Sequence, residues 1–63
     1  MNLTYGDTIE IQAEGKVHRS KVSKVDGKVI KLLEENGTYR QMAAKDLEKM
    51  IAKGFAVVKK HGL

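Results

Sequence analysis

Apolar and polar residues alternate along the first two thirds of the chain, and three short glycine-containing breaks interrupt the alternation. The breaks are Glu14-Gly15, Asp26-Gly27 and Asn36-Gly37, and the runs between them are rich in valine, isoleucine, threonine and tyrosine. Such dipeptides favour two-residue hairpin turns, because both central residues need positive φ. The pattern therefore predicts an antiparallel meander with strands at Thr8–Ala13, Lys16–Val25, Lys28–Glu34 and Thr38–Met42.

The pattern changes after the fourth predicted strand. The segment AAKDLEKMIAKG consists mostly of good helix formers. Three apolar residues in it fall on one helical face: Leu47, Met50 and Ile51. Gly54 suits the left-handed position that ends a helix, and Phe55–Lys60 then predicts a fifth strand. We expect one small domain, residues 1–63, that is mainly β (α+β) in the order ββββαβ, with one short helix before the last strand.

The YGDTIEI opening, the meander, the helical turn around KDLEKM and the closing strand together resemble the SH3-like small β-barrel group. The resemblance covers about Tyr5 to Lys60 and concerns the fold, without a diagnostic motif. It implies a five-stranded antiparallel barrel. Since that architecture carries nucleic-acid binders, peptide binders and assembly subunits alike, the resemblance implies no single function.

Two-residue turns fix the alignment of neighbouring strands, and directly opposed residues share one face of the sheet. Counting outward from the turns predicts these pairs: Ala13–Lys16, Ile11–His18, Ile9–Ser20, Lys24–Val29, Val22–Lys31, Ser20–Leu33, Leu33–Arg40 and Lys31–Met42. This alignment gathers four cations on one face: Lys16, Lys24, Lys31 and Arg40. The opposite face collects Arg19, Lys21 and Lys28, which are opposed by Glu10 and Glu34.

Both faces of the predicted meander are partly apolar, and one helix can cover only one of them. Three arrangements would account for the second face. The meander curls into a barrel with the help of a β-bulge near Arg19–Lys21, a second subunit covers the face, or the face is a binding surface. We favour the barrel, because the chain is short and Phe55–Lys60 can close the sheet.

The chain is moderately basic, with a net charge of +4. Cations along a sheet bind phosphates in a salt-sensitive and largely sequence-independent way. The alternative is that alternating lysines only keep an exposed sheet soluble and unpaired. We predict a small cytoplasmic binding module that contacts nucleic-acid phosphates through a main and a secondary set of cations. The main set is Lys16, Lys24, Lys31 and Arg40, and the secondary set is Arg19, Lys21 and Lys28.

Catalytic chemistry is not indicated. The chain has no cysteine, and His18 and His61 lie far apart in the sequence. A pairing of His18 with Glu10 or Glu14 lacks a nucleophile, and no phosphate-cradling loop or cofactor motif occurs. We therefore expect a protein without enzyme activity, cofactor or metal.

Aromatic residues are few, whereas stacking-type single-strand binders use aromatic platforms on a sheet. Packing at the rim is the commoner role for a tyrosine such as Tyr39. We therefore expect any nucleic-acid contact to be mainly with phosphate.

The competing hypothesis is a protein-interaction or accessory regulatory subunit of the phage or plasmid type. Such a subunit would use the second apolar face, through which it could also form a homo-oligomer. No apolar run is long enough to span a bilayer and no signal-peptide pattern opens the chain, so we expect no membrane association.

Overall fold

The computed structural model describes residues 3–61. The chain forms, in order, β1 (Thr8–Ala13), β2 (Lys16–Asp26), β3 (Val29–Glu34), β4 (Tyr39–Ala43), α1 (Ala44–Ala52) and β5 (Ala56–Lys59). The predicted mainly-β class and the order ββββαβ are confirmed, and each strand boundary lies within one residue of its predicted position. In the described part of the chain, no helix has the length and apolar character needed to cross a membrane.

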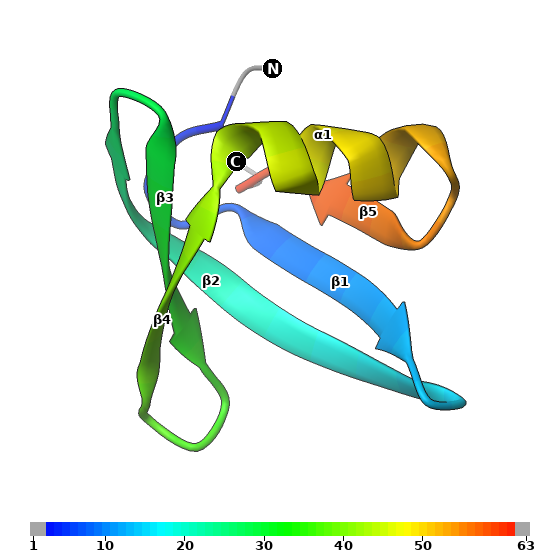
Figure 1. The fold of residues 1–63 in the computed structure, drawn as a ribbon. Coiled ribbons are helices and arrows are strands. Elements are labelled where there is room, and N and C mark those ends of the chain that lie inside the picture. Colours follow the sequence, from blue (N-terminus) through cyan, green and yellow to red (C-terminus); the bar gives the residue numbers. More distant parts are fainter. Residues whose placement is uncertain (1–2, 62–63) are drawn as a thin grey trace.

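The five strands form one antiparallel sheet in the order β4-β3-β2-β1-β5 (Figure 1). The last strand pairs with the first, and α1 contacts both edge strands, β4 and β5. The sheet is strongly curled but open between those edges, and the helix packs across the opening. The likeness to a small β-barrel therefore holds for the curled five-stranded sheet. The expectation that the fifth strand closes a barrel is wrong, because β5 pairs with β1 alone in residues 3–61.

The core lies between α1 and the inner face of the sheet, which is the face that the helix covers. Its buried residues are Ile9, Ile11, Val22, Ile30, Leu32, Leu47 and Ala56. Leu47 is fully shielded from solvent, and Met50 and Ile51 pack partly against the core. The predicted apolar face of the helix is therefore confirmed. Gly54 has φ +83° and its N–H donates to the carbonyl of Ile51, as expected of the residue that ends the helix.

The first hairpin has the predicted turn. Glu14 and Gly15 have φ values of 55° and 74°, as a two-residue type I′ turn requires. The predicted pairs Ala13–Lys16, Ile11–His18 and Ile9–Ser20 are confirmed. The Glu14-Gly15 pattern therefore correctly predicted both the turn and the strand register of the first hairpin.

The other two hairpins have different loops. Asp26 pairs with Val29, so the second loop is Gly27-Lys28, with positive φ at its first residue as in a type II′ turn. The third loop contains three residues, 35–37, because the N–H of Glu34 donates to the carbonyl of Thr38 at 2.8 Å. A three-residue hairpin loop commonly ends on a left-handed residue, and Gly37 with φ +87° supplies it.

These loops change the register of β2, β3 and β4. The observed pairs are Lys24–Lys31, Val22–Leu32, Ser20–Glu34, Leu33–Tyr39, Leu32–Arg40 and Ile30–Met42. The predictions that are wrong are Lys24–Val29, Val22–Lys31, Ser20–Leu33, Leu33–Arg40 and Lys31–Met42. A slip of one residue exchanges the two faces of a strand. Ile30 and Leu32 therefore point into the core, and Leu33 lies on the other face. Because β4 is also shifted by one residue relative to β3, Tyr39 and Arg40 keep their predicted faces.

Candidate functional site

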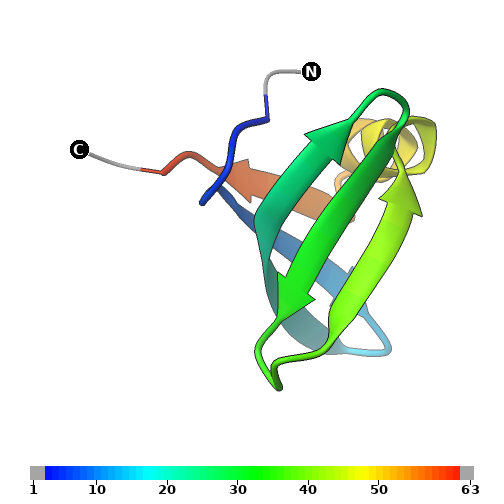
Figure 2. The ribbon, with the colours of Figure 1, turned by 90° about the vertical axis from the view of Figure 1, so that its left-hand side faces the viewer.

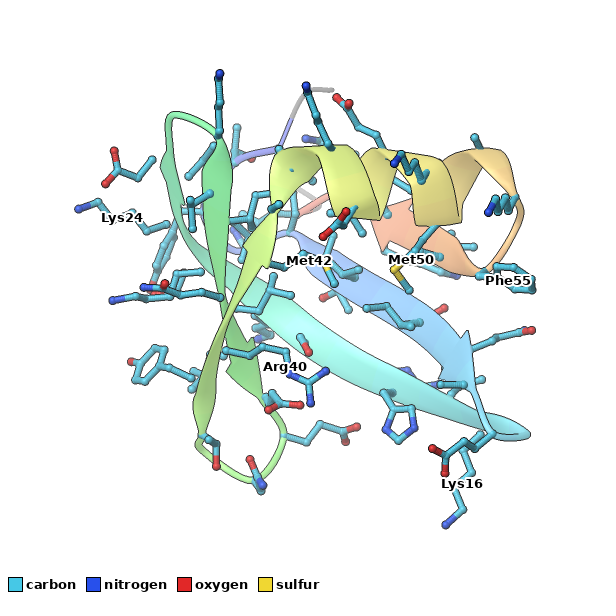
Figure 3. The ribbon with its side chains drawn as sticks, in the orientation of Figure 1. Lys16, Lys24, Arg40, Met42, Met50 and Phe55 are labelled. Atoms are coloured by element: carbon cyan, nitrogen blue, oxygen red, sulfur yellow. The ribbon has the colours of Figure 1, made fainter. Side chains whose placement is uncertain are left out.

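The four cations of the main set do not share a face. Lys24 and Lys31 are paired directly on the outer face, whereas Lys16 and Arg40 occupy inner-face positions. Lys16 lies at the end of the β1–β2 hairpin, far from Lys24 (Figure 3). Arg40 lies 3.4 Å from a carboxylate oxygen of Glu34, so it is already paired. The predicted grouping is therefore wrong, because a register shift in β2 between Val22 and Lys24 moves Lys24 and its partner Lys31 to the outer face.

The secondary set is also divided. Nε of Arg19 donates to Oε2 of Glu10 at 2.8 Å, and this bond lowers the pKa of Glu10 and raises that of Arg19. Lys28 lies in the loop between β2 and β3. Lys21 lies on the outer face, directly opposite Leu33. Arg19 shares the outer face but is bound to Glu10, so Lys21 is the member of this set that we group with Lys24 and Lys31.

The outer face of β2, β3 and β4 is turned away from α1 and toward the viewer in Figure 2. One row of directly opposed residues crosses it from β2 to β4: Lys21, Leu33 and Tyr39. The neighbouring row consists of Lys24, Lys31 and Gln41. We call five of these residues the Tyr39 face: Lys21, Lys24, Lys31, Leu33 and Tyr39. The register thus brings three lysines, one aliphatic side chain and one tyrosine together.

The charges of the Tyr39 face are weakly compensated. Nζ of Lys24 lies 4.0 Å from a carboxylate oxygen of Asp26, but both side chains are largely exposed, so the pair contributes little. Nζ of Lys31 lies 5.9 Å from the centre of the Tyr39 ring, within the range of a cation–π contact. The tyrosine therefore helps to keep a cation above the sheet.

A β-bulge in β2 brings Lys21 and Lys24 to the same face. Residues three apart on a regular strand point to opposite sides, but the register shifts between Val22 and Lys24. We predicted a bulge near Arg19–Lys21, so the observed one lies slightly further along. The N–H of Val22 donates to the carbonyl of Asp7 at 2.8 Å, and the carbonyl of Val22 accepts from the N–H of Gly6 at 2.9 Å. The turn before β1 thus holds the backbone at the bulge.

That turn is fixed by a buried carboxylate, Asp7, whose exposed fraction is 0%. Its oxygens accept from Nζ of Lys60 at 2.6 Å, from the N–H of His61 at 2.7 Å and from the N–H of Thr4 at 3.0 Å. The hydrogen bond from Lys60 is the main reason that the pKa of Asp7 lies well below its ordinary value of 3.8, followed by the two backbone N–H groups. Asp7 therefore joins the two ends of the described chain beside β1.

We call these hydrogen bonds from Thr4, Lys60 and His61 to Asp7 the clamp, and it could not be predicted from the sequence. Lys60 and His61 lie 53 and 54 residues away, and no local pattern connects them to Asp7. Gly6 shows how tight the junction is: its φ is +92°, and a Cβ at this position would lie 3.2 Å from the ring of His61. Close approach and positive φ both require glycine here.

Two adjoining hollows open on the outer side of the sheet, and Lys21 and Leu33 line both. The first, of about 280 Å³, is also lined by Arg19, Glu34 and Glu35, so its charges are mixed. The second, of about 200 Å³, is lined by Tyr5, Gly6, Lys21, Val22, Ser23, Leu33, Tyr39 and His61. None of the described residues lining the second hollow is acidic, so it is the better place for an anion.

The residues considered for catalysis are separated. Glu10 and His18 lie on opposite faces of the first hairpin, because Glu10–Arg19 and Ile11–His18 are successive pairs. Within residues 3–61, no three of the histidine, aspartate and glutamate side chains are grouped so that they could hold a metal ion.

The chain matches no protein-family model, and no curated protein or solved structure matches it. Its function is therefore inferred from the geometry and charge of residues 3–61.

Proposed function

We propose that this chain is a non-enzymatic binding module that holds nucleic acid against the Tyr39 face. The observation that carries the proposal is the gathering of Lys21, Lys24 and Lys31 on one exposed face by the bulge and the register of β2 and β3. Within the part of the chain that the structure describes, the one ion pair recorded for these lysines is the exposed contact with Asp26. Their charge is thus available to phosphates.

The arrangement predicts weak, salt-sensitive binding. Each phosphate neutralised on a single strand contributes about 0.7 to the slope of log affinity against log salt, and about 0.9 on duplex DNA. Three lysines therefore give a slope of about 2 on single strands. Affinities in the range of about 1 to 100 μM at physiological salt are typical of such contacts.

The test is fluorescence anisotropy with dye-labelled single-stranded DNA, single-stranded RNA and duplex DNA at about 50 and 200 mM salt. The double variant Lys21→Glu with Lys31→Glu should lose binding by at least about tenfold, since it also repels phosphates. The matched control is Lys45→Glu with Lys49→Glu, which makes the same change of charge on exposed positions of α1. Equal losses in both variants, or no binding by the unmodified protein at low salt, would contradict the proposal.

A protein-interaction subunit is the second candidate, and a separate observation favours it. Val17, Phe55 and Val57 are about half exposed, with exposed fractions of 45%, 53% and 50%. Val17 and Phe55 line one hollow of about 400 Å³ near the first hairpin. A partner held there would bind with little salt dependence, because apolar burial is not screened. Sedimentation at two salt concentrations would detect a homo-oligomer formed in this way.

A cytoplasmic location of the protein stays a prediction.

A further inference from the structure

Both tyrosines of the chain line the second hollow, although they are far apart in the sequence. Tyr5 has an exposed fraction of 78% and Tyr39 one of 59%. Leu33 lies between the strands that carry Lys21 and Tyr39, and it lines the same hollow. An aromatic ring left this exposed is a large apolar surface that a ligand can cover.

Two lysines of the Tyr39 face, Lys21 and Lys31, lie near these rings. Lys21 lines the hollow itself, and Nζ of Lys31 lies 5.9 Å from the centre of the Tyr39 ring. A flat apolar group in the hollow would therefore have cations within reach of any anionic group attached to it. An aromatic platform beside a cationic track is the arrangement by which proteins bind unpaired nucleotides.

The hollow is large enough for one aromatic base. An apolar cavity of about 150 Å³ is sufficient to hold benzene. The second hollow measures about 200 Å³ and is open on one side to solvent, so a base can enter while its phosphate stays near the lysines. A paired base inside a duplex does not present its flat face to a protein ring.

Tyr5 is held in place by the clamp at Asp7. The carboxylate accepts from the N–H of Thr4, the carbonyl of Thr4 accepts from the N–H of Asp7 at 3.1 Å, and Gly6 is bonded to Val22. Both neighbours of Tyr5 are thus tied to β2 or to the carboxylate. One wall of the hollow is therefore fixed before any ligand arrives, which lowers the entropy cost of binding.

We infer that the hollow between Tyr5 and Tyr39 holds one unpaired base, so that the Tyr39 face prefers single-stranded nucleic acid to duplex. This inference rests on the proposed function and adds a contact with the base to the contact with phosphate. It goes beyond the expectation, drawn from the sequence, of contact mainly with phosphate.

The test uses the chain's own tyrosines. The chain has two tyrosines and no tryptophan, so Tyr5→Phe leaves Tyr39 as the one source of tyrosine fluorescence, and Tyr39→Phe leaves Tyr5. Each variant is titrated with a single-stranded homopolymer of DNA and with an abasic strand of the same length and charge. We expect the normal strand to quench both tyrosines and to bind roughly tenfold or more tightly than the abasic strand.

Two further substitutions at Tyr39 distinguish the contribution of the aromatic ring to binding from an effect on the fold. Tyr39→Ala should weaken binding of the normal strand to the level of the abasic strand, whereas Tyr39→Phe should keep most of the affinity, because its ring still stacks. Phe55→Ala is the matched control, since Phe55 is similarly exposed but lies at the far end of α1 from the labelled Lys24 (Figure 3). Thermal melting monitored by circular dichroism confirms that each variant is folded.

The outcomes distinguish the two claims. Equal affinity for normal and abasic strands, with tyrosine fluorescence unchanged by either, would overturn the inference and leave the contact with phosphate in place. Duplex bound as tightly as single strands at equal salt would also overturn the inference. Failure of every nucleic acid to bind at low salt would overturn the proposed function together with the inference.

Discussion

The two faces of the same three strands differ sharply in what they contact. On the inner face, Ile30 and Leu32 of β3 are fully buried beneath the helix. On the outer face, Leu33 is partly exposed and Tyr39 is 59% exposed, with lysines on both sides. The chain has one helix in its described part, and that helix covers one face. The other face therefore carries apolar surface that stability does not require.

The comparison separates residues that hold the fold from residues that are free to bind. Substitutions on the inner face should lower stability, because the core of so short a chain supplies only about 3 to 5 kcal/mol in total. Substitutions on the Tyr39 face should lower binding while the fold remains. The variants below test this separation, beginning with the largest expected effect.

Leu47→Ala should have the largest effect, since it removes the fully buried side chain of α1. Large-to-small substitutions in a core cost about 2 to 5 kcal/mol, which is comparable to the whole stability of a small domain. Urea unfolding followed by circular dichroism should show a protein that is largely unfolded at 37 °C. Leu33→Ala on the outer face is the control and should cost much less. Equal costs for the two leucines would contradict the assignment of the faces.

Asp7→Asn should give the next largest loss of stability. The substitution removes the charge of the carboxylate that accepts from Lys60 at 2.6 Å and sets an amide N–H₂ against the donors around it. The midpoint of thermal unfolding should fall by about 5 °C or more, whereas Asp46→Asn at an exposed position of α1 should change it little.

The same carboxylate predicts how stability depends on pH. The pKa of Asp7 is lower in the folded state than its ordinary value of 3.8, so the unfolded chain takes up a proton first as the pH falls. The stabilisation is complete above about pH 4 and is lost progressively below it. Asp7→Asn carries no titrating group at this position, so its stability should fall less steeply between about pH 4 and 2. Parallel acid unfolding curves for the two proteins would contradict this account of the clamp.

Replacing one cation on each face of the sheet by alanine compares how much the two faces contribute to binding. Lys31→Ala should weaken binding to single-stranded DNA several-fold and reduce the salt slope by about 0.7, because one phosphate contact is lost. Arg40→Ala should leave the slope unchanged, because Arg40 lies on the inner face beside Glu34. Anisotropy at a series of salt concentrations measures both slopes. A larger change for Arg40→Ala would restore the grouping that the sequence suggested.

The smallest effect is expected at the turn of the first hairpin. Glu14 has φ 55°, a conformation that asparagine adopts more readily than glutamate. Glu14→Asn should therefore raise stability by about 0.5 kcal/mol. Binding should be unchanged, because this turn does not belong to the Tyr39 face. A drop in affinity would indicate that the end of the first hairpin takes part in binding.

The order of elements could be predicted from sequence because each depends on a local signal. Alternation marked the strands, the apolar spacing of Leu47, Met50 and Ile51 marked the helix, and Gly54 marked its end. The register of the first hairpin also followed from Glu14-Gly15. Each of these features depends on residues that are close together in the sequence.

The candidate site could not be predicted in the same way, because it depends on loop lengths and distant contacts. The sequence allows Gly27 to stand either second or first in a two-residue loop, and the fold selects the first position. The third loop has three residues rather than two, and this second slip returns Tyr39 and Arg40 to their predicted faces while β3 between them has exchanged its faces. The hydrogen bond between Asp7 and Lys60 joins residues that are 53 positions apart in the sequence. The three lysines and Tyr39 were thus among the residues considered, but their grouping with Leu33 on one face was not predicted.

The most direct test of the account is a nuclear magnetic resonance titration of the ¹⁵N-labelled protein with a short single-stranded DNA at low salt. We predict the largest shifts of backbone amide signals at Lys21, Lys24, Lys31, Leu33 and Tyr39, with little change in α1. Largest shifts at Lys16 or in α1, or no shifts at saturating DNA, would contradict the claim that the Tyr39 face binds nucleic acid.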